Sequence, residues 1–157
     1  MLVLALLLAQ ADAGVVQHVK ITVRAIKASN DPAAPTGMDP KLAPIEPHLA
    51  SFGEQFRFRS YQLLQEQTFD LDWKAPAQLD LPGGRTLQVI PRSLDADGKI
   101  KVHLELTGQH PEPNTRKLHT DYSIARGGTI LIGGLHVDPV DAKSGKLLIA
   151  VTQEMTK

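Results

Sequence analysis

The chain has 157 residues, no cysteine, and equal numbers of basic and acidic side chains, so its formal net charge is zero. This length fits one domain, and the balanced charge argues against a surface for nucleic acid or anionic lipid. The absence of cysteine argues against a small disulfide-built secreted module and against a cysteine lipid anchor, and it fits either a reducing cytosol or a bacterial envelope.

The N-terminus has the form of a secretory signal. Residues 2–9 are an apolar run, and Ala11-Asp12-Ala13 before Gly14 is a small-x-small cleavage site. No basic residue precedes the run, so a buried N-terminal strand is the alternative. The run is far shorter than the ~20 residues that cross a bilayer, and no later segment is long enough. We predict a signal peptide at 1–13, a single β-rich domain at 14–157, no transmembrane segment, and a periplasmic or extracellular location.

The first strand is expected at His18–Ala25. Its apolar residues alternate with polar ones, which is the pattern of a half-buried strand. The inward face is expected to carry Val19, Ile21, Val23 and Ala25. Residues 29–40 are rich in Pro, Ala, Asn, Asp and Gly and predict a loop.

One short helix is expected next. Asp39 and Pro40 form an N-cap followed by proline at the first helical position. Apolar residues then recur at helical spacing, namely Leu42, Ile45, Leu49 and Phe52. Pro44 and Pro47 each remove a backbone donor, so the helix should be irregular, with Gly53 as its end.

Period-two patterning returns from Phe56. Leu81-Pro82-Gly83-Gly84 predicts a tight turn, Pro91 a bulge or sheet edge, and Asp95-Ala96-Asp97-Gly98 a hairpin. Residues 100–106 and 118–124 alternate as strands, with an exposed loop at 108–115 between them. Thr129–Ile132 and Leu147–Val151 are short apolar runs that predict strands covered on both faces.

These elements predict a mainly β fold. We expect an antiparallel β-sandwich or rolled sheet of about seven or eight short strands, with one short helix near the N-terminus.

The acidic hairpin also resembles the start of a calcium loop. Asp95, Asp97 and Gly98 have that spacing, but the twelfth position, where a bidentate glutamate belongs, is Leu106. A plain turn explains the same residues, so we predict no calcium site.

The histidines form two candidate pairs for metal binding. His103 and Glu105 lie two apart and share a strand face, as do His119 and Asp121. No HxxxH or HExxH spacing accompanies them. All four fall on predicted polar faces, where solvated side chains are expected.

Catalytic motifs are absent from the sequence. There is no GxSxG elbow and no P-loop. Asp70 and Asp72 share a face, as a carboxylate pair would, but a solvated strand predicts the same pattern. Basic residues among aromatics at 56–74 could bind single-stranded nucleic acid, but a sheet core explains those aromatics better. We therefore predict no enzyme activity, no cofactor, and no catalytic, cofactor-binding or metal-ligating residues.

The segment Gly127–Leu135 reads GGTILIGGL. It resembles the first half of the signature near the C-terminal end of secretins, the outer-membrane channels of bacterial secretion systems. In that family such a strand belongs to the barrel wall. The second half, in which an apolar residue precedes a proline, is replaced here by Leu147-Leu148-Ile149. The chain is also too short for a secretin's barrel and ring domains.

A looser likeness covers the order of elements. Leu81–Gly84 and the closing segment from Gly127 to Val151 resemble small exported bacterial domains of unknown function. The two resemblances imply an envelope domain and bring no known activity.

The resulting functional hypothesis is a non-enzymatic exported domain. It would act as a binding or structural component of the bacterial envelope through protein–protein contacts, for example strand addition. The alternative is a metal-dependent binder or small hydrolase that uses His103, Glu105, His119 and Asp121.

Overall fold

The computed structural model describes residues 18–55, 58–108, 115–138 and 141–154. The predicted signal peptide at 1–13 and most of the loop predicted at 108–115 lie outside the described residues. Among the described residues the chain forms nine strands, one α-helix and two short 3-10 helices.

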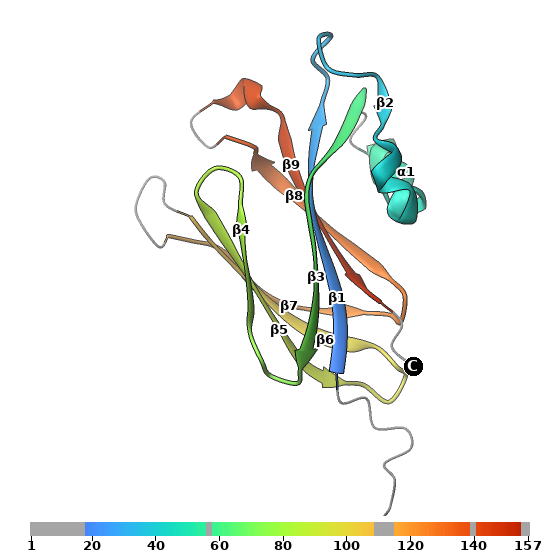
Figure 1. Cartoon of the computed structure of the whole chain (residues 1–157), viewed down its shortest axis with the longest axis vertical. Coiled ribbons are helices and arrows are strands. Elements are labelled where there is room, and N and C mark those ends of the chain that lie inside the picture. Colours follow the sequence, from blue (N-terminus) through green and yellow to red (C-terminus); the bar gives the residue numbers. More distant parts are fainter. Residues whose placement is uncertain (1–17, 56–57, 109–114, 139–140, 155–157) are drawn as a thin grey trace, which may run out of the picture.

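Two sheets make up the fold, as Figure 1 shows. Sheet A has the strand order β2-β3-β1-β9-β8, and sheet B has the order β4-β5-β6-β7. The strands of sheet A are β1 His18–Ser29, β2 Gly37–Met38, β3 Ser60–Asp72, β8 Thr129–His136 and β9 Lys146–Gln153. The strands of sheet B are β4 Ala77–Leu81, β5 Arg85–Leu94, β6 Ile100–Gly108 and β7 Thr115–Ile124. Apart from the parallel pair β2–β3, all neighbours are antiparallel. The prediction of a mainly β fold, a sandwich or a rolled sheet, is confirmed, and the described residues form nine strands where seven or eight were expected.

The main core lies between the two sheets. Alternate side chains of β1 and β9 meet those of β5 and β6 in one aliphatic cluster. Its fully buried members include Ile21, Val23, Leu87, Leu104 and Ile149. The inward face predicted for the first strand is therefore confirmed.

The opposite face of β1 differs from the prediction. The sequence predicted a solvated polar face, but Thr22 and Arg24 are both buried. Arg24 donates from Nε to Glu66 Oε2 at 2.9 Å and from a terminal nitrogen to Thr152 Oγ1 at 3.3 Å. Because β1 is a central strand between β3 and β9, neighbouring side chains cover its polar residues.

The helical segment covers the remainder of that face. A 3-10 helix at Pro40–Ile45 runs into α1, Glu46–Gln55. A second core cluster forms beneath it, with Ile26, Ala28, Leu42, Ile45, Leu49, Tyr61, Leu148 and Ala150 as buried members. The predicted N-cap is confirmed, since Asp39 accepts a hydrogen bond from the Lys41 backbone N–H. The predicted end at Gly53 is wrong, because α1 continues to Gln55.

The predicted turns are confirmed. Gly83 and Gly84 have φ values of 84° and 71° and connect β4 to β5, and Gly98 has φ 84° in the β5–β6 hairpin. A left-handed backbone of this kind favours glycine. Pro91 lies at a register shift between β5 and β6, as the bulge prediction required.

The two apolar runs near the C-terminus differ in burial. The prediction holds for β9, whose residues Leu147–Val151 are buried on both faces. It is wrong for β8, which is the edge strand of sheet A, so Ile130, Leu131 and Ile132 are only partly buried.

Within the described ranges, no helix has the length and apolarity needed to span a membrane.

Substitution in the core tests the inward face of sheet B. Leu104 is fully buried, whereas Leu94 on the neighbouring strand is 41% exposed. Leu104→Ala should lower the free energy of unfolding by about 2–5 kcal/mol, because it removes buried methyl groups and leaves a cavity. Leu94→Ala should change it by less than about 1 kcal/mol. Urea denaturation measures both values, and equal effects would contradict the assigned inward face.

Candidate functional site

The outer face of sheet B brings the two histidine–carboxylate pairs together. Along β6, alternate residues such as Val102 and Leu104 point into the core, so His103 and Glu105 lie on the outer face. Strand β7 is the antiparallel neighbour, and its register places His119 opposite Glu105 and Asp121 opposite His103. The pairs are thus side by side although 14 or more residues separate them in the sequence.

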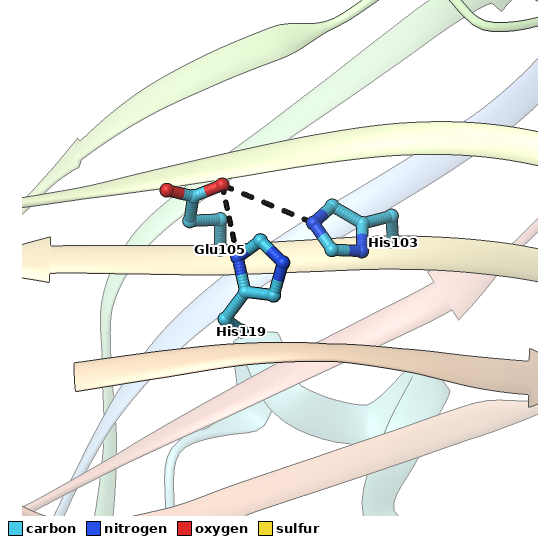
Figure 2. Close-up of side chains that lie close together, drawn as sticks. All are labelled: His103, Glu105 and His119. Atoms are coloured by element: carbon cyan, nitrogen blue, oxygen red, sulfur yellow. Dashed lines mark ion pairs between the residues drawn. The ribbon is translucent and has the colours of Figure 1, made fainter. Parts of the chain in front are cut away.

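Three of these side chains converge on one point, as Figure 2 shows. Glu105 Oε2 lies 3.3 Å from His119 Nδ1 and 3.8 Å from His103 Nε2. One potential ligand atom from each of the three residues lies within 4.8 Å of the others. The two imidazole rings are packed edge to face with their centroids 4.5 Å apart.

Asp121 contacts the other side of the His103 ring. Its Oδ1 lies 2.7 Å from His103 Nδ1 and 3.6 Å from Arg92 Nε. The hydrogen bond from His103, with a smaller contribution from the Arg92 charge, lowers the pKa of the Asp121 carboxyl. Asp121 is therefore an ionised acceptor near neutral pH, and Nδ1 of His103 carries the proton. In the neutral ring this arrangement leaves Nε2, which faces Glu105, as the nitrogen with the lone pair.

The burial of the cluster is uneven. His103 is only 5% exposed, which corrects the expectation of a solvated imidazole. Its ring lies against that of His119, and Ile90 of β5 is its cross-strand neighbour on the other side. By contrast, 46% of the His119 side chain is exposed. The cluster is therefore buried at His103 and accessible to solvent at His119.

The other candidate residues have simpler surroundings. Asp70 and Asp72 are exposed, and their Oδ1 atoms lie 3.9 Å and 3.0 Å from Nδ1 of His18. These contacts are those expected of solvated side chains on a strand surface. In the acidic hairpin, Gly98 N–H donates to the Asp95 carbonyl and Lys99 N–H donates to Asp97 Oδ1. Asp97 also lies 3.7 Å from Lys99 Nζ. These contacts are those of a reverse turn.

Sequence reasoning missed the polar network on the outer face of sheet A. The register aligns four threonines across four strands, namely Thr68, Thr22, Thr152 and Thr129. Hydroxyl–hydroxyl hydrogen bonds of 2.9 Å and 2.7 Å join the outer pairs of the row. The repeated threonines were visible in the sequence, but nothing showed that their strands are neighbours.

A cavity of about 460 Å³ lies at the end of β1, lined in part by Phe58, Asp31, Lys143 and Lys146. Its lining combines the acidic Asp31 with the basic Lys143 and Lys146, so it favours neither an anionic nor a cationic ligand.

Comparison with known proteins gives no match to a family model, to a curated protein or to a solved structure. Functional inference for this chain therefore depends on its own geometry.

The pH dependence of stability tests the His103–Asp121 contact. Because folding lowers the Asp121 pKa, its contribution to stability is present above the unfolded value of about 3.9 and disappears as pH falls through the folded value. Asp121→Asn should therefore reduce stability near neutral pH, and its deficit relative to the unmodified protein should shrink toward pH 3. Urea denaturation from pH 3 to 7 measures the difference. A deficit that does not change with pH would contradict the ionic role of Asp121.

Proposed function

We propose that this domain is a non-enzymatic binding component of the bacterial envelope that joins a partner protein by strand addition at the β8 edge of sheet A. The observation that carries the proposal is the position of β8, because the segment that resembles the secretin signature is itself an edge strand. A partner would contribute an extended segment that pairs with β8 through backbone hydrogen bonds.

The hydrogen-bond pattern identifies the backbone groups available at this edge. Gln153 N–H donates to the Gly128 carbonyl at 3.0 Å, so this carbonyl points toward β9. In an antiparallel pair such positions alternate with positions whose backbone groups point away. Thr129 and Leu131 therefore direct their N–H and C=O groups away from β9, toward the open edge.

The side chains of β8 also favour an added strand. On β9, the residues Leu147–Val151 are fully covered because β9 has a neighbour on each side. On β8, Ile130 and Ile132 pack against the main core and Leu131 against the second cluster, but all three are only partly buried. A strand beside β8 would bury further apolar surface on both faces, which favours association.

The opposite edge of sheet A is less suited to this role. Where β3 begins, β2 pairs with Ser60 and Tyr61 of β3, and the Leu63 N–H donates to Asp39 Oδ2. Farther along β3, Glu66 and Asp70 are exposed acidic side chains. Charged side chains of this kind discourage edge-to-edge pairing.

A proline substitution at Thr129 tests strand addition. Thr129→Pro removes an outward N–H without removing a hydrogen bond to β9, so it should abolish capture of the envelope partner in crosslinking extracts. Thr129→Val is the matched control, because it loses the hydroxyl contact with Thr152 but keeps the N–H. Mass spectrometry of crosslinked products, with circular dichroism to verify folding, gives the result. Undiminished capture by Thr129→Pro, or no capture by the unmodified domain, would refute the proposal.

Export is proposed together with this function. The apolar run at 2–9 and the small residues before Gly14 support it. Protein isolated from the source cells should begin at Gly14 and should be found in the periplasmic or extracellular fraction. N-terminal sequencing after cell fractionation measures both properties. A cytosolic protein that retains residues 1–13 would contradict export while leaving the strand-addition proposal open to its own test.

A further inference from the structure

The outer face of sheet B carries a second site, independent of the β8 edge. Its groups are two imidazole nitrogens and one carboxylate oxygen, contributed by His103, His119 and Glu105. Histidine nitrogen and glutamate oxygen are ligands of zinc and of other divalent first-row transition metals. Calcium and magnesium require mostly oxygen ligands, so the donor set disfavours them.

The spacing of these groups fits one ion. Ligand atoms about 2.0–2.2 Å from zinc, at tetrahedral angles, lie about 3.3–3.6 Å from one another. The observed separations from Glu105 Oε2 are 3.3 Å to His119 and 3.8 Å to His103. The three ligand atoms all lie within 4.8 Å of one another, so their separations are close to those that a single ion requires.

The surroundings of His103 prepare it as a ligand. A ligating histidine usually donates its other ring N–H to a carboxylate, which fixes the tautomer and the ring orientation. Asp121 accepts that hydrogen bond at 2.7 Å, and Arg92 in turn lies 3.6 Å from the same Asp121 oxygen. The other ring nitrogen, Nε2, is thereby directed toward Glu105, whose Oε2 lies 3.8 Å away.

Access to the site comes from the side of His119. This residue lies on β7, the edge strand of sheet B, and its side chain is half exposed. An ion could enter from solvent there, and its fourth position would be open to water.

We propose that His103, Glu105 and His119 bind one divalent transition-metal ion of the zinc class, with Asp121 as the residue that positions His103. The sequence lacks a metal-binding spacing because the ligands come from two strands and meet through the register of β6 with β7.

Titration with zinc chloride at pH 7.5 tests the proposal. The full chain is purified without chelator, stripped with EDTA, dialysed, and titrated by calorimetry. We expect saturable binding of one ion per chain. Replacing an outer-shell partner typically weakens metal binding about 10–100-fold, so Asp121→Asn should have that effect. Loss of a ligand in His119→Gln should weaken binding more than this.

One control variant and a second readout separate a built site from surface binding. His18→Gln removes an exposed histidine that also contacts two carboxylates, and it should leave the affinity unchanged. His119→Gln is preferred to a His103 variant because His119 is half exposed on an edge strand, so its loss should not prevent folding. Absorption by bound cobalt(II) gives a second readout, since a tetrahedral site with nitrogen and oxygen ligands has visible bands that disappear in His119→Gln.

The results that would overturn the proposal are specific. Either the unmodified chain binds no zinc, or His18→Gln and His119→Gln weaken binding equally, which indicates adventitious surface binding. A further contrary result is a His103 imidazolium detected by NMR at pH 7.5 in zinc-saturated protein. In that case the cluster is a proton-bridged ionic network.

Discussion

The aliphatic layer between the two sheets is the constraint on which the other features depend. It is filled mainly by every second side chain of β1, β5, β6 and β9, each an interior strand of its sheet, and the edge strands β4 and β7 add Leu79, Leu81 and Ile124. Since successive side chains of a strand point to opposite faces, fixing Val102, Leu104 and Leu106 inward also fixes His103 and Glu105 outward. A register slip of one residue would bury the charged groups and expose the core. The hydrophobic interior thus holds the polar groups of sheet B in place.

Much of this fold could be predicted from the sequence because its signals are local. Strict alternation around Val19–Ala25, the glycines at 83, 84 and 98, and Pro91 each determine the backbone near them. Strand order is not local, and the errors arose there. The burial of Arg24 and the only partial burial of Ile130 both follow from whether a strand is central or at an edge. The same limit applied to the histidines, since only the β6–β7 register shows that His119 lies opposite Glu105.

The two proposed sites lie on different sheets and use different chemistry. Strand addition depends on main-chain groups at the β8 edge, whereas the metal site depends on side chains of β6 and β7. They are nevertheless close along the chain, because β7 ends at Ile124 and β8 begins at Thr129. The short connection contains Gly127, with φ 72°, and the Gly128 N–H donates to the Ala125 carbonyl. This tight turn carries the chain from one sheet to the other.

The pairing of β1 with β9 has a consequence for the order in which the chain folds. Ile21 lies opposite Gln153, so β1, the first described strand, can pair with β9 only when the last described strand is present. Contacts of such long sequence separation slow folding, because the chain loses the entropy of a large loop before the contacts form. The β1–β9 pairing of sheet A therefore cannot form until the segment that ends at Gln153 has been synthesised. If the chain is exported as proposed, sheet A would stay incomplete while the segment that carries β9 is still being made.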